Sequence, residues 1–140
     1  MINIIYGLKG SGKTAKIIDR ANEQVRETKG TVLFITDRKD HSRAVSNKIR
    51  FVCVKDYGIS SEESCVPFFK GLLAGNYDIS DIFVDGLARF TGMKVEDMEN
   101  IYKDIDLLSS DHKVDFTFTV SVETVPDYMK KYIKNNYLRG

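Results

Sequence analysis

A glycine-rich run close to the amino terminus has the residue types and spacing of a phosphate-binding loop. The run Gly7-Leu8-Lys9-Gly10-Ser11-Gly12-Lys13-Thr14 matches the pattern G-x-x-x-x-G-K-[ST] and lies between a strand-like and a helix-like stretch. Its glycines let backbone N–H groups surround an anion, and its lysine reaches the β and γ phosphates. The alternative is a glycine-rich turn without a ligand. The run predicts a nucleoside triphosphate site with contacts from Gly7, Leu8, Lys9, Gly10, Ser11, Gly12, Lys13, Thr14 and Ala15.

Two residues have the chemistry to hold a magnesium ion beside such a phosphate chain. Mg²⁺ prefers oxygen ligands and usually keeps several waters, so one hydroxyl and one carboxylate suffice. Thr14 supplies the hydroxyl, and Asp85 ends the apolar run Ile82-Phe83-Val84. Parallel sheets place such strand ends beside the ligand crevice. We therefore predict Thr14 and Asp85 as metal ligands, with an ordinary turn-capping role for Asp85 as the alternative.

Residues 7–14 and 82–85 resemble the Walker A and Walker B motifs of the P-loop NTPase superfamily. The first motif is highly specific for the superfamily, whereas the second is weak alone. The layout is similar to the RecA-like and thymidine-kinase-like branch, in which a further strand follows the second motif and inserts beside the P-loop strand. The resemblance implies an α/β fold in one domain, residues 1–140: a three-layer α/β/α sandwich with a mostly parallel five-stranded sheet.

The resemblance also bears on the catalytic carboxylate. Many hydrolases of this branch carry Glu directly after the Walker B aspartate, where it polarises the attacking water, but here Gly86 follows Asp85. A carboxylate at the end of another strand can take that place, which makes Asp37 and Glu123 candidates. Either residue could equally be an ordinary loop carboxylate. The candidate catalytic set is Lys13, Asp85, Asp37 and Glu123.

Arginines and a serine follow the same predicted strands. A guanidinium at Arg38, Arg43 or Arg89 could stabilise transition-state charge or stack on a base, although solvated loop arginines are commoner. Arg89 is the first of these to test. Ser121 resembles a sensor residue that contacts the γ phosphate, and a packed or exposed serine is the equal alternative.

Apolar runs that alternate with helical stretches predict βαβ units around a parallel sheet. The last predicted strand alternates apolar residues with threonine and serine, which is more typical of an edge strand, although threonine also packs under helices. The strands are predicted at 3–6, 31–36, 50–54, 81–84 and 114–122.

The helical stretches contain several end signals. Gly30 is placed to end the first helix in the left-handed conformation. Ser60 with Glu63 resembles a capping box, but Pro67 favours a start near Ser64. Further helices are predicted in the 37–49 connection, over 95–108, and after Pro126 with a basic end of Lys130, Lys131, Lys134 and Arg139.

Composition excludes several classes of protein. With 21 Lys and Arg against 20 Asp and Glu, the 140-residue chain has no general charge preference for nucleic acid or anionic membranes. It lacks the roughly 18 consecutive apolar residues of a membrane span, and its short apolar start is no export signal, so we expect a cytoplasmic protein. Cys53 and Cys65 lie in apolar stretches and are predicted to be buried thiols. His41 and His112 flank charged residues and are predicted to be solvated.

These observations lead to three functional hypotheses. The first is an ATP-binding protein with slow Mg²⁺-dependent hydrolysis, coupled to a process that the sequence does not reveal. The second is a nucleoside or small-molecule kinase, and the third is a non-catalytic module gated by nucleotide. The absence of an Asn-Lys-x-Asp motif makes ATP the expected nucleotide over GTP. A homo-oligomer or a protein partner remains open.

Overall fold

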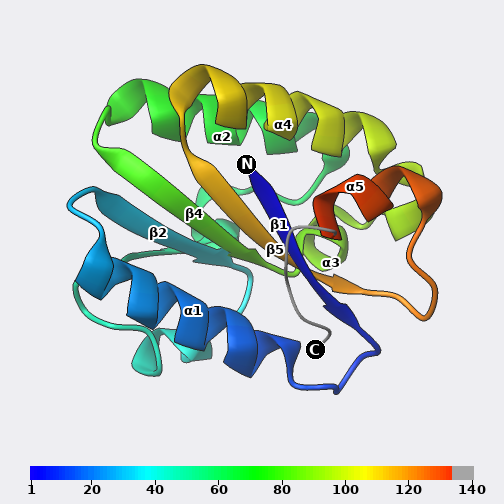
Figure 1. Ribbon diagram of the computed structural model, residues 1–140, viewed down its shortest axis with the longest axis horizontal. Coiled ribbons are helices and arrows are strands. Elements are labelled where there is room, and N and C mark those ends of the chain that lie inside the picture. Colours follow the sequence, from blue (N-terminus) through cyan, green and yellow to red (C-terminus); the bar gives the residue numbers. More distant parts are fainter. Residues whose placement is uncertain (134–140) are drawn as a thin grey trace.

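Five parallel strands form one sheet in the computed structural model of the protein, which describes residues 1–133 (Figure 1). The strand order is β1-β5-β4-β2-β3, and every neighbouring pair is parallel, so the sheet is entirely rather than mostly parallel. The predicted strands are confirmed, with ends that shift by at most two residues. They are β1 (Ile2–Gly7), β2 (Thr31–Thr36), β3 (Arg50–Cys53), β4 (Ile79–Asp85) and β5 (Asp115–Ser121).

Helices cover both faces of this sheet. Helix α1 lies on one face and α2 and α4 lie on the other, which gives the expected three layers (Figure 1). No helix within residues 1–133 combines the length and apolar character needed to cross a membrane. The α-helices are α1 (Lys13–Glu27), α2 (Glu62–Gly75), α3 (Leu87–Thr91), α4 (Glu99–His112) and α5 (Lys130–Ile133). Short 3₁₀ helices occupy Lys39–Arg43, Val54–Tyr57, Val95–Asp97 and Asp127–Met129.

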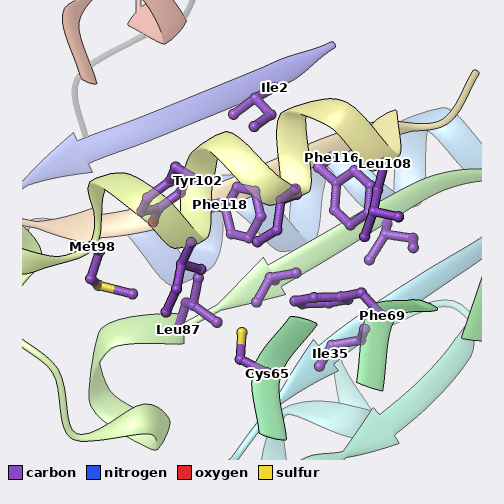
Figure 2. Packing of buried hydrophobic residues seen from close by; sticks show 14 of the residues in the cluster. Ile2, Ile35, Cys65, Phe69, Leu87, Met98, Tyr102, Leu108, Phe116 and Phe118 are labelled. Atoms are coloured by element: carbon purple, nitrogen blue, oxygen red, sulfur yellow. The ribbon is translucent and has the colours of Figure 1, made fainter. Parts of the chain in front are cut away.

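The larger hydrophobic core lies between the sheet and helices α2 and α4. Phe69 of α2 packs edge-to-face on Phe116 of β5, and Tyr102 of α4 packs edge-to-face on Phe118 (Figure 2). The ring centroids of these pairs are 5.5 and 5.2 Å apart. Cys65 belongs to this core, and both cysteines are free and buried as predicted. Burial raises the pKa of the Cys65 thiol to about 12, so this thiol stays protonated. A smaller core packs beneath α1.

Strand β5 is central, between β1 and β4, so the expectation that its threonines mark an edge is wrong. Phe116 and Phe118 face the larger core, and the alternation of the strand turns Thr117 and Thr119 toward the α1 face. Both threonines are only 6% exposed. A threonine can pack there because its methyl group fills space, while its hydroxyl is free to bond neighbouring groups.

Gly30 does not end α1, contrary to the sequence prediction. The helix ends at Glu27, and Thr28 continues with an extended backbone. Gly30 has no positive φ, but a Cβ there would lie 2.6 Å from the Cβ of Ser80. The glycine is therefore required by the close approach of the chain to β4, not by a left-handed turn.

Other helix ends also differ from their predictions. Helix α2 begins at Glu62, behind a capping box made by Ser61 and Ser64, and includes Pro67. The capping box is therefore shifted by one residue from the predicted Ser60–Glu63 pair, and the helix begins two residues before Ser64 in spite of the proline. The 37–49 connection holds only a 3₁₀ helix, the 95–108 stretch begins with one, and α3 was not predicted. The basic end at Lys134 and Arg139 lies outside the described residues.

Candidate functional site

The strand ends predicted to carry the chemistry meet at one edge of the sheet. In the strand pairing Gly7 lies opposite Ser121, and Thr36 lies opposite Asp85. Beside these ends is a cavity of about 360 Å³, within the roughly 300–1,000 Å³ usual for small-molecule pockets. Four cations but one carboxylate line it, which favours an anionic ligand. The lining residues are Lys9, Gly10, Gly12, Lys13, Thr14, Arg38, His41, Asp85, Gly86, Ala88, Arg89, Thr119 and Ser121.

The glycine loop, residues 7–14, connects β1 to the start of α1. Gly10 and Gly12 have φ of +82° and +92°, a region that other residues rarely adopt, and a Cβ at either would project into open space. Gly12 directly precedes α1, so the unpaired N–H groups of the first helical turn open at the loop. Gly7, in contrast, ends β1 without a positive φ. The local backbone therefore has the form of an anion-binding cradle.

Lys13 lies inside this loop with 7% exposure. Its ammonium donates to the carbonyl oxygen of Leu8 at 2.7 Å and lies 3.5 Å from the hydroxyl of Ser11. Burial lowers the pKa of Lys13, Asp85 opposes that shift, and the charge of Arg89 adds to it. A nearby anion would favour the charged form of Lys13.

Thr14 and Asp85 lie together, as predicted. The Thr14 hydroxyl is 3.3 Å from both carboxylate oxygens of Asp85, which is 2% exposed. Thr119 donates to Asp85 Oδ1 at 2.8 Å and accepts from the Gly86 N–H at 3.1 Å, so it fixes the carboxylate from β5. This pair of hard oxygen donors suits Mg²⁺. Among residues 1–133 no cluster of three or more Asp, Glu, His or Cys could hold a metal by itself, so phosphate oxygens and water would complete the shell.

Asp37 is engaged by Arg89 rather than directed into the cavity. Arg89 Nε donates to both oxygens of Asp37 at 3.0 and 3.1 Å, and Nη2 donates to Oδ1 at 2.6 Å. Burial acts to raise the pKa of the Asp37 carboxyl, but the hydrogen bonds and charge of Arg89 outweigh it and hold that pKa below its usual value. Asp37 faces a neighbouring hollow instead, and it does not line the cavity.

The remaining predicted residues divide into two groups. Arg38, Ser121 and Lys9 line the cavity with Gly10 and Gly12. The predicted contacts Gly7, Leu8 and Ser11 do not line it. Glu123 lines a separate, adjacent hollow of about 480 Å³, and Ala15 and Arg43 are exposed and do not line the cavity. The structure therefore brings together the glycine loop, Asp85 and Arg89, but not Glu123.

Two polar residues that line the cavity, His41 and Thr119, were not predicted as site residues. His41 was predicted to be solvated, but it lines the cavity, and its Nε2 is buried without a hydrogen-bond partner among the described residues. Thr119 was assigned only to a polar strand face. The one signal in the sequence was its position four residues before Glu123, near the end of a strand that was already predicted to lead to a site residue.

No protein-family model and no curated protein matches this sequence. The arrangement of side chains around the cavity is therefore the basis on which a function can be proposed.

Proposed function

We propose that the protein binds ATP with Mg²⁺ in the cavity beside the glycine loop and hydrolyses it slowly. One observation carries the proposal. The two positive-φ glycines of the loop, Lys13, Thr14 and Asp85 all line the same cavity, although 71 residues separate Thr14 from Asp85. The loop amides and Lys13 suit the phosphates, and Thr14 with Asp85 suits the metal that accompanies them.

The sheet topology supports a P-loop NTPase fold of the RecA-like and thymidine-kinase-like kind. That branch is expected to insert a strand between the P-loop strand and the Walker B strand, and β5 lies between β1 and β4. The position of Thr119 adds a physical reason for this order, because only a strand beside β4 can bond Asp85 in this way.

Slow turnover follows from the carboxylates around the cavity. Asp85 is engaged with Thr14 and Thr119, and Asp37 is paired with Arg89. Within residues 1–133, Asp85 is the one carboxylate that lines the cavity, so none is left to polarise water. Positioning and charge stabilisation would then supply most of the rate enhancement.

A second hollow favours phosphoryl transfer to a small acceptor as the alternative function. It measures about 480 Å³, is lined by Glu96, Glu123 and Thr124, and shares Ala88, Arg89 and Ser121 with the cavity. A hydroxyl-bearing acceptor there would lie next to the nucleotide site. Glu123 would then be its neighbouring carboxylate.

Isothermal titration with ATP, ADP and GTP, with and without Mg²⁺, tests the proposal. We expect Lys13→Ala to weaken ATP binding by roughly 100-fold, about 2.7 kcal/mol, because a buried charge-assisted contact is lost. Lys29→Ala is the matched control, since it removes an exposed lysine just beyond the opposite end of α1. If the folded wild-type protein binds no nucleotide at millimolar concentration, or if Lys13→Ala binds as well as wild type, the proposal is wrong.

A single-turnover assay then separates the three functions. Phosphate released from MgATP in water indicates a hydrolase, and phosphate transferred only to an added nucleoside or sugar indicates a kinase. Binding without either product indicates a nucleotide-gated module.

A further inference from the structure

The guanidinium of Arg89 lies between two carboxylates at the edge of the cavity. Its Nη2 is 2.6 Å from Asp37 Oδ1 and 3.8 Å from Asp85 Oδ2. Arg89 belongs to α3, one turn after Asp85, whereas Asp37 directly follows β2. The Arg89 guanidinium is therefore held by a carboxylate at the end of the neighbouring strand, 52 residues earlier in the sequence.

Asp37 occupies only one edge of this guanidinium. Nε and Nη2 make the hydrogen bonds to Asp37, and no hydrogen bond of Nη1 is found among the described residues. A guanidinium has five N–H donors in a rigid fork, so fixing one edge orients the other. Arg89 itself lines the cavity, whereas Asp37 does not. Asp37 thus holds a cation whose remaining donors are available to a ligand.

Gly86 makes the space that Arg89 occupies. Its φ is +89°, and a Cβ there would lie 2.3 Å from Arg89 Nη2 and 2.5 Å from Cζ. No side chain could occupy position 86 while the guanidinium stays in place. The observed position of Arg89 therefore requires glycine after Asp85. Many P-loop hydrolases carry glutamate at that place.

The location beside Asp85 decides which phosphate this cation can meet. Thr14 and Asp85 would hold the Mg²⁺ that neutralises the terminal phosphates of a nucleoside triphosphate. Because Arg89 lies 3.8 Å from Asp85, it would then lie beside the phosphate that shares this metal.

We propose that Arg89 contacts the terminal phosphate and makes the cavity selective for nucleoside triphosphates over diphosphates, and that Asp37 is the positioning residue that holds it. This inference rests on the proposed function. It assigns Asp37 a different role from the one its position in the sequence suggested, since a carboxylate with both oxygens bonded to a guanidinium is a poor acceptor for a proton from water.

The test compares ATP and ADP affinities, with Mg²⁺, in wild type, Arg89→Ala, Arg89→Lys and Asp37→Asn. We expect Arg89→Ala to lower the ratio of ATP to ADP affinity by about tenfold, with ADP affinity within about twofold of wild type, because ADP has no terminal phosphate to lose. Arg89→Lys keeps the charge but not the fork, so it should lie between. Arg43→Ala is the matched control, an exposed arginine outside the cavity.

A double-mutant cycle tests the role of Asp37. If Asp37 acts by positioning Arg89, Asp37→Asn lowers the affinity ratio alone but changes nothing further in the Arg89→Ala background. A further fall in the affinity ratio in the double variant would mean that Asp37 acts on the nucleotide itself and would overturn its positioning role.

The outcomes separate this inference from the function on which it depends. Binding of both nucleotides by wild type, with an affinity ratio unchanged in Arg89→Ala, removes the role of Arg89 and leaves the nucleotide site intact. Failure of wild type to bind either nucleotide removes both. Circular dichroism and thermal unfolding of each variant establish that the variant is folded.

Discussion

The two halves of the cavity are built in different ways. The glycine loop and Lys13 form a contiguous segment whose shape comes from backbone conformation, with positive φ at Gly10 and Gly12 and a helix start directly behind them. The half around Arg89 is assembled from the ends of β2, β4 and β5 by side-chain hydrogen bonds. The conformation of the first half depends mainly on its own sequence. The second half forms only when β2, β4 and β5 lie side by side in the sheet.

This difference assigns the halves different tasks. Under the proposed function, the backbone amides and Lys13 would bind the phosphates of any nucleotide, because such groups recognise little besides charge. The second half contains the carboxylate suited to the metal and the arginine beside it, so it can respond to how many phosphates are present. Variants on either side of Asp85 should therefore separate general affinity from selectivity.

Asp85→Asn should have the largest effect, because Asp85 contacts both halves. We expect the affinity for MgATP to fall by roughly 100-fold, about 2.7 kcal/mol, while binding of metal-free ATP changes little. Titrations with and without Mg²⁺ measure this. Asp81→Asn is a matched control, since Asp81 lies in the same strand but outside the cavity and is bonded there by Ser80 and Gln24. An Asp85→Asn variant that keeps its magnesium dependence would contradict the assignment of the metal ligands.

Within the cavity, Gly86→Ala should impair the half around Arg89 and leave the glycine loop unchanged. A Cβ at position 86 displaces the guanidinium, so the ratio of ATP to ADP affinity should fall by about five- to tenfold. A positive φ in alanine also destabilises the fold by roughly 1–2 kcal/mol. Gly92→Ala controls for that strain, because Gly92 has a φ of +71° at the end of the same helix and nothing within 4 Å of its Cβ position. Equal loss of selectivity in both variants would show that strain, and not Arg89, is responsible.

The same division explains what the sequence could predict. The glycine loop and Asp85 were found because their chemistry is local: a residue pattern, a strand before it and a helix after it. The Asp37–Arg89 pair joins residues 52 apart, and its geometry depends on β2 lying beside β4. Arg89 and Asp37 were each candidates, but their pairing was not predicted, because neither stretch of sequence shows which strands are neighbours in the sheet.

The fold shows the same limit. Apolar runs located β1 to β4, since burial on both faces requires continuous hydrophobic stretches, and an alternating run located β5. The alternating pattern of β5 predicted an edge, although the strand is central, because Thr119 is needed beside Asp85 and not in solvent. Gly30 likewise has a role set by the distant Ser80. When the role of a residue depends on a contact with a distant part of the chain, local propensity does not predict that role.

Thr119→Val should have a smaller effect than these substitutions, on both stability and magnesium dependence. The change keeps the shape but removes the donor to Asp85 and leaves the buried Gly86 N–H without an acceptor, so we expect roughly 1 kcal/mol less stability and weaker magnesium dependence. Urea unfolding and titration measure both effects. Thr117→Val makes the same change on the same face, at a threonine that does not line the cavity. Equal losses in the two variants would mean that the bond to Asp85 is not the cause.

The smallest expected effect is the pH dependence of the Asp37–Arg89 pair. The pair holds the pKa of the folded Asp37 carboxyl below its usual value of 3.8, so its stabilisation is complete above that value and is lost as the pH falls through the lower, folded pKa. Because Arg89 is 39% exposed, solvent screening limits the contribution to roughly 0.5–1 kcal/mol. Urea unfolding should therefore show Asp37→Asn less stable than wild type at pH 7, with a gap that closes below the usual pKa. Asp40→Asn, an exposed carboxylate of the same loop, should show no such gap. A gap that persists in acid would mean that Asp37 stabilises the loop by packing, and that its charge does not hold the cation in place.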